Sequence, residues 1–177
     1  MSDMTLRVSF DVDQISECLY WTLTDGRIPE PAPSGKENGT FPLTAGKTFG
    51  IEVEATGIDE GVTITLIDAF LTTLPILFSR DNQCGAVPGV YPYPSPFFDP
   101  ANVQQGATAR FTFGEPKPDV AQTRIWDSRE TPLVLNGGRW DTSFALTVAI
   151  TANGATRYRV FGFDPETESS SGATPPN

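Results

Sequence analysis

Alternation of apolar and polar residues is the strongest pattern in this chain. Apolar side chains occupy every second position of residues 4–12, which predicts a strand with one buried face. The same period recurs in 48–56 and 62–70, and shorter apolar runs suggest further strands at 19–23, 74–78, 107–113, 123–126 and 133–135. No segment shows the 3.6-residue period of a helix, so the pattern predicts an all-β chain.

The clearest single element is a hairpin centred on Asn153-Gly154, because this dipeptide favours a tight turn between two apolar runs. Two registers are open. A two-residue turn places Arg157 and Arg159 on the face shared by the apolar residues of the first strand. A three-residue loop, with a bulge at its glycine, places Tyr158 and Val160 there and turns the arginines outward. We favour the three-residue loop, because it keeps both guanidinium groups away from the core.

Length and composition indicate one domain with many turns. The chain has 177 residues, among them 16 glycines and 16 prolines. We therefore expect a single β-sandwich over residues 1–165, made of two antiparallel sheets in a jelly-roll or immunoglobulin-like arrangement. Long Pro-rich loops interrupt it at 27–39 and 81–105. Residues 166–177 offer little apolar surface to bury, and we expect a disordered C-terminal tail there.

The charge of the chain limits its partners. Its net charge is −10, which disfavours binding to nucleic acid and to anionic membranes. The first residues are acidic and alternating rather than typical of a signal peptide, so we expect a cytoplasmic protein. In that compartment Cys18 and Cys84 are expected to be free, buried thiols, with a single disulfide between them as the alternative.

Histidine is absent from the sequence, which excludes histidine-based catalytic triads and zinc sites. We expect no enzyme activity and no cofactor. The remaining candidates for metal ligands are carboxylates that follow the first and last strands, namely Asp11, Asp13 and Asp164. If those strand ends meet, calcium could bind between them. The alternative is that these carboxylates are ordinary solvated charges.

A loop of alternating proline and aromatic residues is the main candidate for a partner or ligand surface. It presents Tyr91, Tyr93, Phe97 and Phe98 on a backbone that proline stiffens toward polyproline II. Such aromatics could contact a partner or a sugar ring. The alternative is that the two phenylalanines close one end of the core. We expect the three tryptophans in the core or at sheet edges rather than in a ligand site.

The closing strand, with the sequence YRVFGFDP, resembles that of the AidA/PixA inclusion-body protein family. Tyr158, Phe161 and the run Gly162-Phe163-Asp164-Pro165 carry the likeness. The resemblance implies a bacterial, cytoplasmic β-sandwich that self-associates, with no established chemistry and no site residues to assign. We therefore expect a non-enzymatic structural or interaction protein that forms homo-oligomers. The alternative is a carbohydrate- or calcium-binding module that uses loops at one end of the sandwich.

Overall fold

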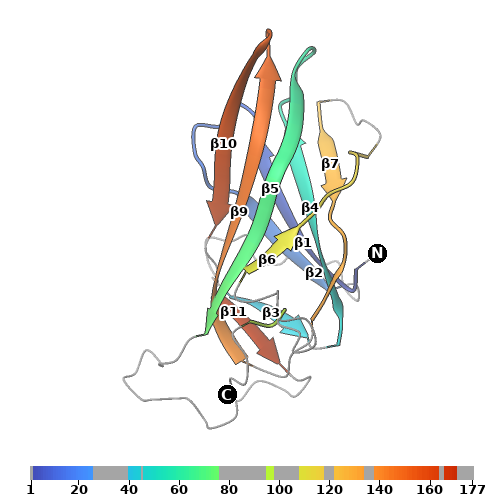
Figure 1. Ribbon diagram of the computed structural model, residues 1–177, viewed down its shortest axis with the longest axis vertical. Coiled ribbons are helices and arrows are strands. Elements are labelled where there is room, and N and C mark those ends of the chain that lie inside the picture. Colours follow the sequence, from blue (N-terminus) through green and yellow to red (C-terminus); the bar gives the residue numbers. More distant parts are fainter. Residues whose placement is uncertain are drawn as a thin grey trace.

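The protein is a two-sheet β-sandwich, as the sequence predicts (Figure 1). The computed structural model describes residues 2–25, 40–44, 46–75, 95–97, 108–117, 122–133, 138–163 and 166–170. Within these ranges the chain forms eleven strands. None of the described residues belongs to a helix long and apolar enough to span a membrane.

Sheet A contains five strands. Its order is β2 (Tyr20–Asp25), β1 (Met4–Asp11), β4 (Thr48–Thr56) and β7 (Arg124–Asp127), and β8 (Thr131–Pro132) also pairs with β4. The pairing of β1 with β4 is parallel, whereas the other pairs in this sheet are antiparallel. The parallel pair arises because the chain passes through β2 and then through a strand of the other sheet before it returns as β4.

Sheet B contains six strands. Its order is β3 (Thr40–Thr44), β11 (Glu166–Ser170), β9 (Gly138–Ala152), β5 (Thr63–Pro75) and β6 (Thr108–Phe111), and β10 (Ala155–Phe163) also pairs with β9. The prediction of a disordered tail is wrong for Glu166–Ser170. This segment lies between β3 and β9, where backbone hydrogen bonds hold a strand without needing apolar side chains.

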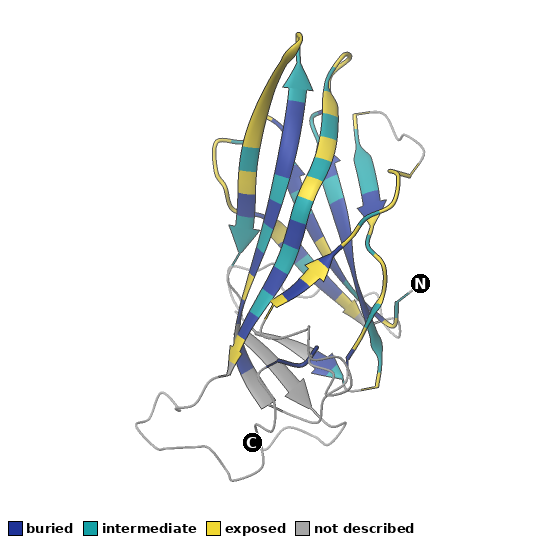
Figure 2. Ribbon diagram, viewed as in Figure 1, coloured by how far each residue is buried: buried dark blue, intermediate teal, exposed yellow. Residues whose placement is uncertain are grey.

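The core lies between the two sheets and follows the predicted alternation. Buried and less buried residues alternate along β1, and β9 buries Phe144, Leu146, Val148 and Ile150 on one face (Figure 2). Aromatic rings connect the sheets: the ring of Phe10 in β1 stacks on Phe161 in β10, with centroids 4.6 Å apart. Trp21, Trp126 and Trp140 are all buried, as expected.

The β9–β10 hairpin has the two-residue turn, so the three-residue loop that we favoured from the sequence is wrong. Ala155 pairs with Ala152, and Asn153 and Gly154 have φ angles of 51° and 75°. Two consecutive left-handed residues define a type I′ turn, whose twist matches that of the strands it joins. Local turn geometry therefore sets the register.

This register reverses the burial that we expected for β10. Arg157 and Arg159 share the inner side of sheet B, opposite Ile150 and Val148 of β9. Tyr158 and Val160 face outward, with 71% and 54% of their surfaces exposed. The arginines do not need to enter the core, because β10 is an edge strand and its long side chains reach past the sheet.

Candidate association site

One side of the sandwich is closed by residues 12–19, which join β1 to β2; we call them the β1–β2 segment. The guanidinium of Arg159 reaches this segment from the edge of sheet B. It donates from Nη1 to the carbonyl oxygen of Gln14 at 2.5 Å, and from Nη2 to those of Ile15 and Ser16 at 3.3 Å each. One side chain thus supplies hydrogen bonds to three consecutive carbonyl groups of the other sheet's connection.

Arg157 makes a second link to the same segment. Its Nη2 donates to the carbonyl oxygen of Val12 at 2.7 Å and lies 3.5 Å from a carboxylate oxygen of Asp13. The guanidinium of Arg159 also lies over the ring of Phe161, 4.5 Å from its centroid. Charge-assisted hydrogen bonds of this kind are stronger than neutral ones, so the two arginines join the sheets firmly.

The backbone completes this closed side. The N–H of Gly162 donates to the carbonyl of Glu17 at 2.9 Å, and the N–H of Leu19 donates to the carbonyl of Gly162 at 3.0 Å. A Cβ atom on Gly162 would lie only 2.8 Å from the carbonyl oxygen of Phe144. Only glycine fits this close approach to β9 within sheet B. The two backbone hydrogen bonds place the β1–β2 segment along the edge of β10, where an added strand would lie.

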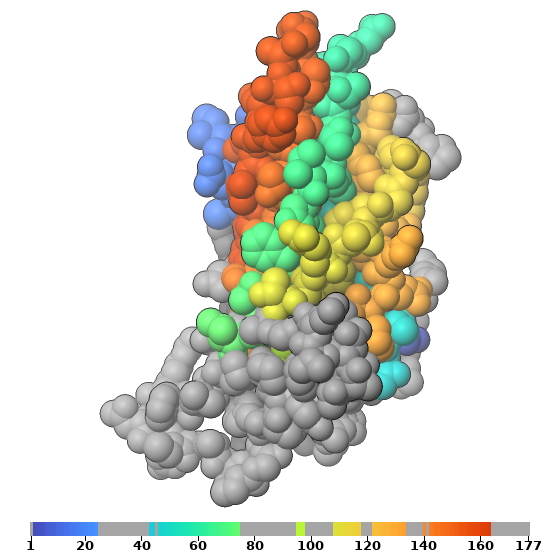
Figure 3. Space-filling view, in the orientation of Figure 1, coloured from blue at the N-terminus to red at the C-terminus, as the bar shows by residue number. Residues whose placement is uncertain are grey.

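The opposite side of the sandwich is open along the first half of β5. β6 pairs with β5 only from Ala69 to Thr72. In the described part of the chain, no strand pairs with that edge of β5 before Ala69. Figure 3 shows the upper part of β5, in green, at the open margin of the molecule above the yellow segment that contains β6.

The type I′ turn determines which backbone groups point to this open edge. The residues that flank a two-residue turn bond to each other, so Ala152 points its N–H and C=O toward β10 and Thr151 points its own toward β5. Thr63 lies opposite Thr151 and bonds to it. Since the direction alternates along a strand, Ile64 and Leu66 point their N–H and C=O groups away from β9, toward the open edge.

A groove of about 600 Å³ lies beside this edge. It runs between residues 64–68 of β5 and residues 110–116, and the buried residues Phe111 and Trp126 line it. Ile64 and Leu66 are only partly buried. The open side therefore combines unpaired backbone groups with apolar side chains, the two features that a further strand would cover.

The open edge carries no charged residue between Thr63 and Ile67. The first charge beyond it, Asp68, forms an ion pair with Arg110 at 2.9 Å. In a chain of net charge −10, this uncharged edge is a place where an acidic surface can approach with little repulsion.

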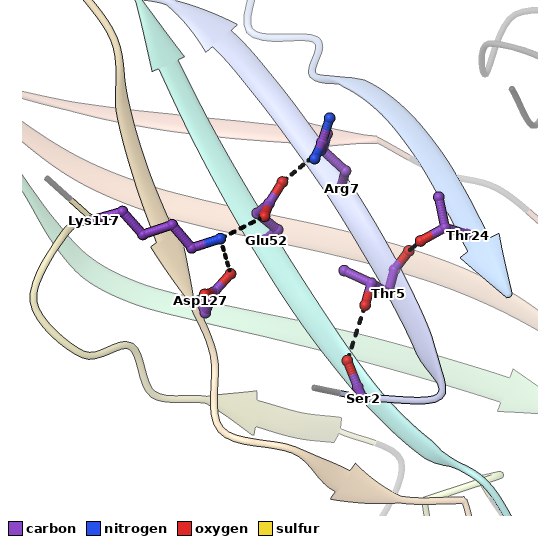
Figure 4. A network of polar contacts seen from close by, with 7 residues as sticks. All are labelled: Ser2, Thr5, Arg7, Thr24, Glu52, Lys117 and Asp127. Atoms are coloured by element: carbon purple, nitrogen blue, oxygen red, sulfur yellow. Dashed lines mark hydrogen bonds and ion pairs between the residues drawn. The ribbon is translucent and has the colours of Figure 1, made fainter. Parts of the chain in front are cut away.

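A second candidate is a network of charged side chains on the outer face of sheet A (Figure 4). Nε of Arg7 lies 2.5 Å from one carboxylate oxygen of Glu52, and Nζ of Lys117 lies 2.8 Å from the other. Nζ of Lys117 is also 3.0 Å from Asp127. Both oxygens of Glu52 are thus held by cations, and the network cross-links β1, β4 and β7 through the segment that carries Lys117.

Two pKa values respond to this arrangement. Burial by itself raises the pKa of Glu52, but the hydrogen bonds and charges of Lys117 and Arg7 outweigh it and leave that pKa below its ordinary value. The hydrogen bond to Glu52 raises the pKa of Lys117 above its ordinary value. Glu52 is therefore held ionised, and it has no proton to exchange near neutral pH.

A hollow of about 260 Å³ adjoins the network and is lined by hydroxyl groups and charges. The N-terminal segment crosses the sheet here, and a Cβ atom on Gly50 would lie 2.6 Å from the Oγ atom of Ser2. In this hollow both carboxylate oxygens of Glu52 already have cationic partners. The clearest role of these contacts is to hold sheet A and the segment before β7 together.

The predicted metal ligands that the structure describes have different partners. Asp11 accepts hydrogen bonds from the backbone N–H of Asp13 at 2.9 Å and from the hydroxyl of Thr56 at 3.1 Å. Asp13 faces Arg157. Asp164 lies outside the described residues. Among the described residues, no group of three or more carboxylate, thiol or imidazole side chains is placed to hold a metal ion.

The aromatic loop falls largely outside the described residues, which include neither Tyr91, Tyr93 nor Phe98. Phe97 is described and is 1% exposed, so its assignment to a partner surface is wrong. Its ring packs edge-on against Phe49, 5.4 Å away, and it closes one end of the core. A ring this apolar is more stable between the sheets than in water.

Cys18 is a free thiol, as expected, but it is exposed rather than buried. It lies in the β1–β2 segment, where its backbone forms an isolated β-bridge with Gly162 at the rim of the sandwich. Cys84 lies outside the described residues.

The functional residues that the sequence did not reveal are Arg157, Arg159 and the edge residues Ile64 and Leu66. The arginines were visible, but their role depends on the hairpin register. The open edge depends on where β6 ends relative to β5. Neither models of known protein families nor the curated proteins include a match to this chain, so the interpretation of the site depends on its geometry.

Proposed function

We propose that this protein is a non-enzymatic structural or interaction protein that associates with copies of itself. The observation that carries the proposal is the open side of sheet B, where an uncharged strand edge borders a groove lined by both apolar and polar side chains. Sheet edges of this kind pair readily with another strand, and natural proteins usually protect them with charges, proline or a covering segment. Between Thr63 and Ile67 the sequence has neither a charge nor a proline, and no strand among the described residues covers this edge.

The exposed outer face of sheet B, which extends from this edge across β9 to β10, supports the same proposal. Tyr158 and Val160 stand on β10, and the neighbouring outward residues of β9 are alanine and threonine. Large apolar residues on a flat, uncharged surface favour contact with another protein. On a chain of net charge −10, such a surface limits repulsion between copies.

The alternative, a calcium- or carbohydrate-binding module, has less support. Of its three candidate ligands, Asp11 and Asp13 already accept hydrogen bonds or face an arginine. The alternative would gain support from a rise in melting temperature with calcium or with a panel of sugars.

Light scattering during size-exclusion chromatography tests the proposed function. We expect the mass of the eluting protein to rise from monomer to dimer or beyond as its concentration increases from low micromolar to millimolar. Added salt should favour association, because it screens repulsion between acidic copies. A protein that stays monomeric over the whole range, at low and at high salt, would contradict the proposal.

A further inference from the structure

We propose that two copies of this chain pair through the open edges of their β5 strands, antiparallel and about a two-fold axis that passes between the two Thr65 residues. In this arrangement Ile64 of each copy lies opposite Leu66 of the other. The inference depends on the proposed self-association and names the surface that would produce it. It also predicts a closed dimer, because a two-fold contact uses the same surface of both copies.

The direction of the backbone groups supports this register. Ile64 and Leu66 point their N–H and C=O groups toward the open edge, as the type I′ turn and the pairing with β9 require. With Ile64 opposite Leu66 of the second copy, both residues exchange two hydrogen bonds with their partners. Thr65 then faces Thr65 of the second copy as a non-hydrogen-bonded pair, the arrangement in which side chains lie closest.

Side chains also match across the proposed axis. Ile64 and Leu66 both point to the inner side of the sheet, opposite Ile150 and Val148 of β9. Each therefore meets an apolar residue of the second copy beside the groove. On the outer side, Thr65 meets its own equivalent, and no charged pair is buried.

The charges that flank the edge favour a second copy over an unrelated strand. The turn that precedes β5 contains Asp59 and Glu60, both exposed. At the other end of the open edge, the side chain of Arg110 in β6 is 73% exposed. A two-fold axis at Thr65 brings the acidic turn of one copy toward the end of β6 in the other, so opposite charges meet twice.

Two features limit the pairing to a short stretch. The register between β5 and β9 shifts between Leu66 and Asp68, which marks a β-bulge. Directly beyond it, β6 occupies the edge from Ala69 onward. Bulges and short edges restrict the growth of a sheet. The contact therefore joins two copies without exposing a new edge of the same kind.

Cross-linking at the axis tests the register. In a background with Cys18→Ser and Cys84→Ser, we expect Thr65→Cys to form a disulfide-linked dimer under mild oxidation. A non-hydrogen-bonded antiparallel pair has Cα atoms about 4.5 Å apart, which is within the range of a disulfide. Thr63→Cys is the matched control: Thr63 is also exposed on the same edge, but it would lie opposite Ile67 of the second copy. It should cross-link far more slowly.

A charge at the axis provides an independent test. Thr65→Lys would place two ammonium groups opposite each other, and like charges across an interface are costly, so the dissociation constant should rise at least about tenfold. Thr156→Lys is the control, because Thr156 is an exposed threonine on β10 at the other edge of the sheet. Both variants should melt at nearly the wild-type temperature when dilute.

The outcomes separate the two proposals. A dimer that forms but cross-links equally through Thr63→Cys and Thr65→Cys, or through neither, would overturn the β5 pairing and leave self-association in place. The same holds if Thr156→Lys weakens the dimer as much as Thr65→Lys does. A wild-type protein that remains monomeric at every concentration would overturn both.

Discussion

The two long sides of this sandwich treat the edges of sheet B in opposite ways. At β10, the β1–β2 segment lies along the edge and receives hydrogen bonds from Arg157 and Arg159. At the first half of β5, no described strand covers the edge, and Ile64 and Leu66 are only partly buried. The same sheet thus has one edge satisfied within the chain and one edge available for pairing.

The difference shows what closing an edge requires. The closed side uses two long cationic side chains, a glycine whose backbone N–H and C=O bond to the β1–β2 segment, and a connection long enough to span the two sheets. Between Thr63 and Ile67 the open edge carries no charge, and its residues are threonine, isoleucine and leucine. If this contrast is functional, substitutions on the closed side should mainly affect stability, and substitutions on the open side should mainly affect association.

The largest effect is expected for Phe161→Ala, on the closed side. Phe161 is fully buried and stacks on Phe10, so its loss should lower the free energy of unfolding by about 3–5 kcal/mol. Phe113→Ala is the control beside the groove, where the ring is only partly buried and the loss should be less than half as large. Urea unfolding of both variants measures the difference. Equal losses would mean that the open side is packed as firmly as the closed one.

The next largest effect is expected for Arg159→Ala. It should lower the free energy of unfolding by about 2 kcal/mol, because a charged donor to several carbonyl groups is removed from a partly buried position. Arg110→Ala removes an exposed arginine from the open side and should cost less than about 0.5 kcal/mol. Thermal unfolding at low protein concentration compares the two in the monomer. A larger loss from Arg110→Ala would reverse the assignment of the closed and open sides.

The Glu52 network should make stability depend on pH. Because the pKa of Glu52 is lower in the folded protein than its ordinary value of 4.5, its contribution is present above that value and disappears as pH falls through the folded pKa. Glu52→Gln should lower the free energy of unfolding by about 1–2 kcal/mol at neutral pH. It should also make that free energy fall less steeply as the pH is lowered. Glu54→Gln, on the same strand, is the control. A wild-type pH profile in the Glu52 variant would contradict the role of the network.

Apart from the control substitutions, Gly154→Ala should have the smallest effect, about 1 kcal/mol, because the left-handed conformation at φ 75° disfavours a side chain although the space around it is empty. This turn determines the register of β10, and hence where the arginines point. Amide hydrogen exchange along β9 and β10 should show faster opening near the turn. A change in protection that reaches the β1–β2 segment would show that the turn and the arginine contacts open together.

Much of the fold could be predicted from alternation alone. The pattern predicted the bounds of β1 and β4 closely and assigned their buried faces correctly, because the inner residues of a half-buried strand must be apolar. It did not reveal β3 or β11, whose pairing depends on backbone hydrogen bonds to strands far away in the sequence. The parallel pairing of β1 with β4 was also hidden, since it follows from the order of the connections.

The site was less predictable than the fold. The hairpin register was misjudged because we weighed burial of Arg157 and Arg159 above turn geometry. At an edge strand, an inward-facing arginine can still reach carbonyl groups at the rim. The open edge at Ile64 and Leu66 could not be predicted from local sequence, because it depends on how far β6 extends. Phe97 was misassigned because an aromatic residue among prolines looks the same in sequence whether its ring is outside or inside.

The type I′ turn at Asn153-Gly154 has a consequence for the order in which this protein folds. A hairpin closed by such a turn forms within microseconds, because its contacts are local in sequence. The pairing of β5 with β9 joins residues as distant as Thr72 and Ser143, and proteins dominated by such contacts fold in milliseconds to seconds. We therefore expect the β9–β10 hairpin to form first and to serve as the template on which β5 later docks. Until it docks, β5 has both of its edges free, and this is the stage at which a growing chain is most exposed to pairing with the wrong strand.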